Sequence, residues 1–154
     1  MTYVTSTTSA AETVKLAGRL ATILHGGEVI ELSSDLGGGK TTFVQGLALA
    51  LGFKGSVTSP TFTLSQVYQL PNGLELHHYD LYRLGTVGIV GQELAEDMGH
   101  QNVITTIEWG DVAEDVLPAD RLRVKIEITA EQERRWTFNS SGSVSDHLVQ
   151  GLQS

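Results

Sequence analysis

The residues best suited to phosphate chemistry follow one another in residues 34–42, which read Ser-Asp-Leu-Gly-Gly-Gly-Lys-Thr-Thr. The three consecutive glycines lack a Cβ, so their backbone can take positive φ and bring N–H donors close to a polyphosphate. The lysine would supply positive charge to the β- and γ-phosphates, and the first threonine a hydroxyl ligand for Mg²⁺. The segment therefore predicts a P-loop that binds a nucleotide through Gly37, Gly38, Gly39, Lys40 and Thr41.

The elements expected on either side of this loop are those that a P-loop requires. A predicted strand, Glu28–Leu32, leads into the loop, and a predicted helix from Thr41 carries one apolar face and stops at Gly52. The positive end of that helix dipole would point at the same anion. In the general pattern G-x-x-x-x-G-K-[ST], Ser34 stands at the first glycine, and it would be strained if that position requires positive φ.

A Mg-nucleotide site also needs an acid at the end of a neighbouring strand, and the sequence offers two. Glu108 ends the apolar run Val-Ile-Thr-Thr-Ile and is the better candidate for the metal, although an exposed strand-end glutamate is the alternative. Asp80 ends a second predicted strand and is a candidate to orient water or a nucleotide hydroxyl, or else to cap the next turn. Because α/β sheets bind ligands beyond the carboxyl ends of their strands, both acids are expected at one site.

Three other side chains near these acids admit a chemical and a plain structural interpretation. His77 and His78 are adjacent on a predicted strand and point to opposite faces, so packing or solvation is favoured over metal binding. Trp109 could stack on a base or a partner, or belong to the core. Thr61 lies where switch loops of P-loop enzymes contact Mg²⁺ or phosphate, but a simple Ser-Pro-Thr turn is almost equally favoured.

The remaining elements predict one α/β domain with a mixed sheet flanked by helices. Besides the P-loop unit, helices are expected from a capping box at Ser9 and around residues 90–98. Pro71-Asn-Gly joins two extended runs, 62–70 and 74–79, into an antiparallel hairpin, and residues 121–128 and 135–139 are expected to pair. Residues 140–154 are rich in Ser and Gly and are expected to fray.

Composition limits the classes of function. The chain has 154 residues, 40% of them hydrophobic, no cysteine and a net charge of −8. Disulfides and thiolate metal sites are excluded, and so few basic residues do not favour independent binding of RNA or DNA. The sequence shows neither a signal peptide nor an apolar run of about 20 residues, so the expected location is cytoplasmic, without a membrane.

Four motifs together resemble the TsaE (YjeE) family of small bacterial P-loop ATPases. They are Asp35-Leu-Gly-Gly-Gly-Lys-Thr-Thr-Phe43, Ser59-Pro-Thr-Phe62, His78-Tyr-Asp-Leu-Tyr-Arg83 and Ile107-Glu-Trp109. The resemblance implies a P-loop fold with a partly antiparallel sheet, and an ATPase that supports turnover of the TsaB–TsaD pair during threonylcarbamoyladenosine synthesis on tRNA. It also implies that tRNA is met only through that complex.

The same resemblance implies roles for individual residues. Thr42 would join the phosphate-binding residues, Thr41 and Glu108 would lie at Mg²⁺, and Asp80 would lie at ATP. Lys40, Glu108 and Asp80 are then the expected catalytic residues. Two other classes remain open: a nucleotide-dependent binding module with negligible hydrolysis, and a small P-loop kinase, which would usually carry an arginine-rich lid that this sequence lacks.

Overall fold

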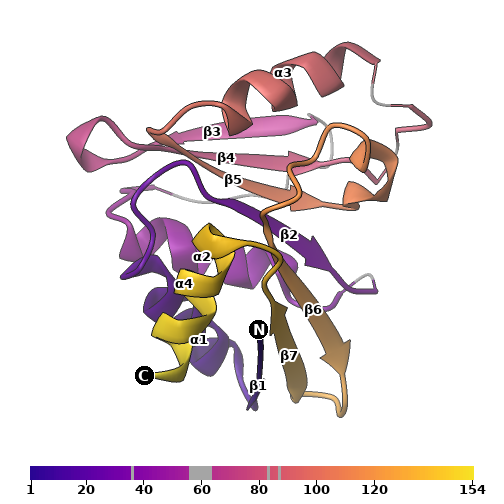
Figure 1. Cartoon of the computed structure of the whole chain (residues 1–154). Helices are drawn as coiled ribbons and strands as arrows, with labels where there is room; N and C mark the ends of the chain where they lie inside the picture. The colour runs from indigo at the N-terminus through magenta and orange to yellow at the C-terminus, as the bar shows by residue number, and fades with distance from the viewer. Residues whose placement is uncertain (36, 56–63, 83, 87) are drawn as a thin grey trace.

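The computed structural model describes residues 1–35, 37–55, 64–82, 84–86 and 88–154 (Figure 1). In these residues one seven-stranded sheet has the order β1-β7-β6-β2-β5-β4-β3. The strands are β1 Thr2–Thr7, β2 Val29–Ser33, β3 Ser65–Gln69, β4 Glu75–Asp80, β5 Val103–Glu108, β6 Leu122–Ile128 and β7 Arg134–Asn139. The helices are α1 Ala10–Ala21, α2 Lys40–Ala50, α3 Gly88–Met98 and α4 Ser143–Gln153.

The sheet is mixed, as the sequence predicts. Strands β4, β5, β2 and β6 run parallel, whereas β3 pairs with β4, and β7 with both β6 and β1, in antiparallel fashion. The expected hairpin is present, because the 3₁₀ turn Pro71–Gly73 joins β3 to β4. The parallel core places the carboxyl ends of β2 and β5 at the same edge, where a ligand of an α/β sheet is expected.

Helices cover both faces of the sheet, as parallel strands require. On one face α1, α2 and α4 enclose the larger core, in which the rings of Phe43 and Trp136 stack with their centroids 5.0 Å apart. On the other face α3 covers a smaller core that includes Tyr79, Leu94 and Ile107. The central strand β2 is therefore enclosed on both sides, and its carboxyl end leads toward Ser34 and the start of α2 (Figure 1).

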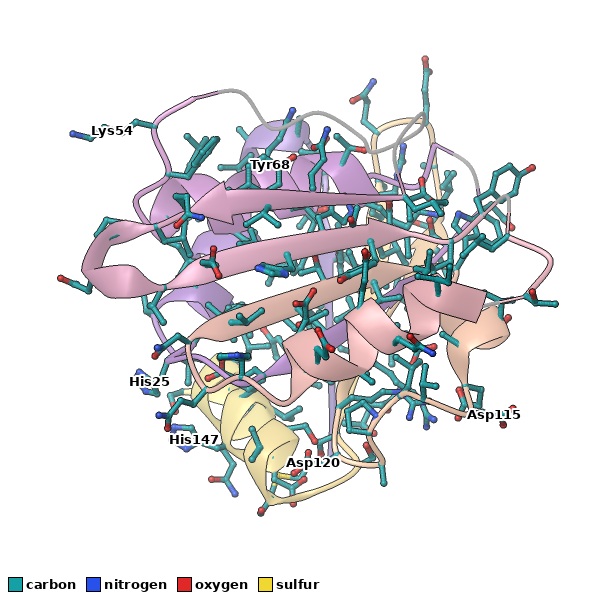
Figure 2. The ribbon with its side chains drawn as sticks, turned by 90° about the horizontal axis from the view of Figure 1, so that it is seen from above. His25, Lys54, Tyr68, Asp115, Asp120 and His147 are labelled. Carbon is teal, nitrogen blue, oxygen red and sulfur yellow. The ribbon has the colours of Figure 1, made fainter. Side chains whose placement is uncertain are left out.

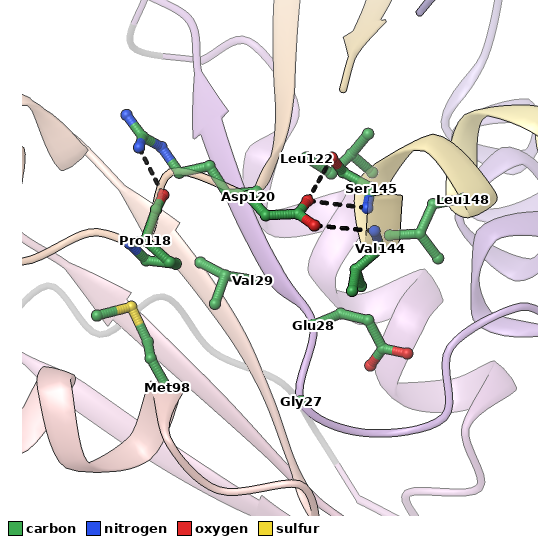
Figure 3. Close-up of a pocket in the computed structure, with 11 residues that line it drawn as sticks. Gly27, Glu28, Val29, Met98, Pro118, Asp120, Leu122, Val144, Ser145 and Leu148 are labelled. Carbon is green, nitrogen blue, oxygen red and sulfur yellow. Dashed lines mark hydrogen bonds between the residues drawn. The ribbon is translucent and has the colours of Figure 1, made fainter. Parts of the chain in front are cut away.

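The carboxy-terminal segment corrects one expectation. Residues 140–154 are not frayed: α4 occupies most of them and buries Leu148, Val149 and Leu152 in the larger core. Asp120 holds its first turn, because its carboxylate accepts hydrogen bonds from the amides of Val144 (2.8 Å) and Ser145 (3.0 Å) and from the Ser145 hydroxyl (2.7 Å) (Figure 3). This cap comes from a residue distant in sequence, so no local signal announces it.

The electrostatics of Asp120 follow from this cap. Burial raises the pKa of its carboxyl, but the hydrogen bonds from Ser145 and Val144 outweigh burial and hold the pKa below its usual value.

The amino-terminal strand β1 was also not expected; it pairs along its whole length with β7. Among the described residues, no helix combines the length and the apolar character needed to cross a bilayer.

Candidate nucleotide site

The glycine loop connects the end of β2 to the start of α2. Gly37 (φ 79°) and Gly39 (φ 100°) have the left-handed backbone that glycine tolerates best, and Gly39 forms the N-cap of α2 without any side-chain cap. The first turn of α2 contains no acid, and Thr41 and Thr42 there are half-buried. Unpaired N–H groups at such a turn favour an anion.

The middle glycine, Gly38, is required by packing. A Cβ on Gly38 would overlap the hydroxyl of Ser34, would lie 2.7 Å from the Ser34 Cβ and 3.1 Å from the carbonyl oxygen of Asp35. The Ser34 hydroxyl donates to that same carbonyl at 2.7 Å. Ser34 therefore occupies space inside the loop that only a glycine at position 38 leaves open.

The expectation of strain at Ser34 is wrong. Among the described residues other than glycine, only Asn72 and Trp109 have positive φ, so the serine adopts an ordinary backbone conformation. Its role is contact: its carbonyl oxygen accepts a hydrogen bond from Lys40 Nζ at 3.3 Å. The position of the first P-loop glycine thus tolerates a side chain here, because that side chain turns toward Gly38.

Lys40 is held above the loop by two described groups. Its side chain is largely buried, and besides the Ser34 carbonyl its ammonium nitrogen lies 4.4 Å from the centroid of the Trp109 ring. A desolvated cation–π contact of this kind contributes up to about 2 kcal/mol. Trp109 itself has a left-handed backbone (φ 59°, ψ 48°), and its ring also lies 4.7 Å from that of Tyr82. The indole therefore contacts Lys40 at the site and also packs against the smaller core.

The two candidate acids meet at the same edge of the sheet as the loop. Asp80 pairs with Glu108 across β4 and β5, and Glu108 pairs with Leu32 across β5 and β2, two residues before Ser34. Glu108 is 2% exposed, which rules out the alternative of a solvated strand-end glutamate. In Figure 2, Asp115, which follows β5, and Lys54, which follows α2, lie at opposite ends of the sheet. The carboxyl end of β5 is therefore at the end where α2 begins.

The environment of Asp80 disfavours its charge. Burial raises the pKa of Asp80; the Tyr82 amide, which donates to the carboxylate at 3.1 Å, opposes the rise, and the Glu108 carboxylate adds to it. Lys40 and His78 act on Asp80 in the direction that favours its charged form. The turn-capping alternative for Asp80 is thus present in the structure, together with its place beside Glu108.

The two histidines of β4 face opposite sides of the sheet, as predicted, but each has a carboxylate partner. His77 Nδ1 lies 2.6 Å from Asp97 on α3, whereas His78 Nε2 lies 3.1 Å from Glu108. In the described part of the chain, no three histidines, cysteines or acids form a cluster that could hold a metal by themselves. The pairing of His78 with Glu108 was missed because it joins two strands; only a register for β4 and β5 could have revealed it.

One motif of the sequence analysis and the last residue of another fall outside the described part of the chain. Thr61 with residues 59–62, and Arg83, lie outside the described residues. The residues that the structure brings together are the glycine loop, Lys40, Asp80 and Glu108. To these it adds Ser34, His78 and Trp109.

Comparison with known proteins identifies the family. The family model described as threonylcarbamoyl adenosine biosynthesis protein TsaE matches residues 7–136, which contain every residue of the candidate site. This chain belongs to the TsaE family. Proteins of the TsaE family take part in the biosynthesis of threonylcarbamoyladenosine on tRNA.

Individual relatives agree with the family model over most of their length. The TsaE protein of Bacillus subtilis is 34% identical over 151 residues, which cover 95% of this chain and 90% of the relative. The TsaE protein of Streptomyces coelicolor is 38% identical over 133 residues, covering 83% and 90%. The crystal structure of Bacillus subtilis YdiB superposes with a TM-score of 0.83 at 29% identity, covering 99% of this chain and 95% of that one. The P-loop NTPase-like fold expected from the sequence is confirmed.

Proposed function

We propose that this chain binds ATP with Mg²⁺ at the glycine loop and hydrolyses it. The observation that carries the proposal is the meeting of Lys40, Asp80 and Glu108 at the carboxyl edge where β2 passes into the loop. A cation and two carboxylates in a largely buried setting suit a polyphosphate with its metal ion. The residues present fit the group, because Gly37 and Gly39 have positive φ and Gly38 admits no side chain.

Each residue has a proposed part in binding or hydrolysis. The N–H groups of Gly37, Gly38 and Gly39 and the first turn of α2, including Thr42, bind the phosphates; Lys40 neutralises the β- and γ-oxygens. Thr41 and Glu108 hold Mg²⁺, which when bound neutralises charge that develops on the phosphates. Asp80 orients the attacking water or a nucleotide hydroxyl. Its position next to Glu108 and within electrostatic reach of Lys40 supports that role.

The family supports a more specific function. Its named relatives are threonylcarbamoyladenosine biosynthesis proteins, so we place the ATPase in that modification of tRNA. In this proposal TsaB and TsaD are the partners, and hydrolysis allows their complex to turn over repeatedly in the cytoplasm. With a net charge of −8, the chain contacts tRNA through those partners and not alone.

Reconstitution tests the proposal. The purified chain is combined with TsaB, TsaD, a threonylcarbamoyl donor and tRNA, and modified adenosine is counted per complex with ATP, without ATP, and with a non-hydrolysable ATP analogue. We expect several rounds of modification only with hydrolysable ATP. A single round in every condition, with ATP bound but not consumed, would favour a binding module without hydrolysis. Transfer of labelled phosphate to a small acceptor instead of to water would favour a kinase.

A further inference from the structure

His78 and Glu108 form a buried pair on the α2-facing side of the sheet. His78 is 0% and Glu108 2% exposed, and Nε2 of the imidazole lies 3.1 Å from Oε2 of the carboxylate. In the register of β4 and β5, His78 lies opposite Thr106, and Asp80 lies opposite Glu108. Because side chains alternate along a strand, His78, Asp80 and Glu108 share one face. The imidazole thus reaches the acid from inside the protein.

The hydrogen bonding of the pair is one-sided. A carboxylate only accepts, so the proton lies on Nε2 of His78. Nδ1 of the same ring is buried and has no partner among the described residues. Within that part of the chain, the one side-chain hydrogen bond of His78 is therefore the bond to Glu108, although buried polar atoms are ordinarily satisfied. Among the described residues, the side-chain hydrogen bonding of His78 is therefore directed at Glu108 alone.

We propose that His78 is a positioning residue for Glu108 in the hydrolysis of Mg-ATP. Its hydrogen bond to Oε2 restricts rotation of the carboxylate, so that Oε1 would be the oxygen offered to Mg²⁺. A group that holds a metal-binding carboxylate in this way typically changes metal affinity or activity by about 10- to 100-fold when it is removed. The inference rests on the proposed function, in which Glu108 lies at Mg²⁺.

His77, the next residue, provides a matched control. It is also a buried histidine of β4 with a carboxylate partner, but it points to the opposite face. There its Nδ1 contacts Asp97, which also accepts a hydrogen bond from the Tyr79 hydroxyl, and its Nε2 lies 3.5 Å from Glu75. His77 therefore connects β4 to α3 and does not touch Glu108. Substitution of His77 therefore perturbs β4 without removing a contact of the proposed metal ligand.

The test uses two substitutions that differ in reach. In His78→Gln the side-chain amide can lie near the place of Nε2 and still donate to Glu108; in His78→Asn the side chain is one bond shorter and cannot. For each variant, ADP binding is measured by calorimetry at increasing Mg²⁺ concentrations and in EDTA. The rate of ATP hydrolysis is measured at saturating ATP, and the melting temperature is recorded. His77→Asn is measured alongside.

We expect His78→Asn to raise the Mg²⁺ concentration for half-maximal tightening of ADP binding by about 10- to 100-fold and to slow hydrolysis similarly. Binding in EDTA should not change. His78→Gln should recover most of the loss, and His77→Asn should leave the Mg²⁺ requirement unaltered. Equal behaviour of the Asn and Gln variants, or an equal shift in His77→Asn, would overturn the inference. Failure of the wild-type chain to bind ADP with Mg²⁺ would instead overturn the proposed function.

A measurement on the wild-type chain covers the case in which a variant does not fold. Imidazole ¹⁵N resonances distinguish the Nε2–H from the Nδ1–H form of each histidine. His78 should show the Nε2–H form, and its resonances should shift when Mg²⁺ is added to the ADP-bound chain, whereas those of His77 should not. An Nδ1–H form, or resonances that ignore Mg²⁺, would contradict the positioning role.

Discussion

Gly38→Ala tests whether Ser34 shapes the phosphate loop. The added methyl would overlap the Ser34 hydroxyl, lie 2.7 Å from its Cβ and 3.1 Å from the Asp35 carbonyl oxygen, so the loop must shift. Overpacking of this degree costs about 1–3 kcal/mol. If ATP binding requires the original conformation of the loop, the same cost is paid on binding and weakens the affinity for ATP by about 5- to 150-fold. The affinity is measured by calorimetry, and the melting temperature separates a local from a global effect.

The decisive control is the double variant Ser34→Gly/Gly38→Ala. Removing the serine side chain eliminates the two closest contacts, so much of the lost affinity should return. The 3.1 Å contact with Asp35 remains and keeps the recovery partial. Ser34→Gly alone should change affinity little, because Ser34 has no positive φ to relieve. If the two substitutions were simply additive, Ser34 and Gly38 would not be coupled, and the packing argument would be refuted.

Three further outcomes follow from the site and the fold. Lys40→Ala should lose most nucleotide binding, and its free energy of unfolding should fall by no more than about 2 kcal/mol, the contribution of the cation–π contact. An unchanged ATPase rate would contradict the P-loop assignment. Glu108→Gln should slow hydrolysis far more than it weakens ATP binding, which single-turnover kinetics can separate; equal losses would argue against a metal role. Asp120→Asn should lower the melting temperature at pH 7. Because the folded pKa of Asp120 is depressed, its stabilisation is present above its unfolded pKa of about 3.9 and disappears as pH falls through the folded value. The two melting curves should therefore converge in acid, and a constant difference would refute the cap.

Features encoded within a few residues were predictable from the sequence. The glycine loop, the strand before it and the helix after it follow from local chemistry, and Pro71-Asn72-Gly73 announces the hairpin. Asp80 and Glu108 were assigned to strand ends from apolar runs, and the register of β4 with β5 confirms both positions. Their roles at a metal and a nucleotide remain a proposal.

Features that depend on contacts between distant residues were not predictable. The pairing of β1 with β7 joins the two ends of the chain, and Asp120 caps α4 from outside that helix and its flanking turn. Composition alone therefore suggested a frayed end where a helix forms. The bond between His78 and Glu108 depends on strand register, and the space that Ser34 occupies depends on the path of the loop. In each case the sequence names the residue but not the neighbour that determines its role.

The central place of β2 has a consequence for how the chain is made. Its neighbours lie far downstream: Val29 pairs with Thr105, and Ile30 with Leu122. During synthesis the strand before the glycine loop therefore remains unpaired on both sides until most of the polypeptide has left the ribosome. Parallel pairing over such separations is intrinsically slow and leaves strand edges exposed meanwhile. On this view the phosphate loop is shaped only when the sheet is complete, so acquisition of nucleotide binding by a nascent chain should mark the end of folding.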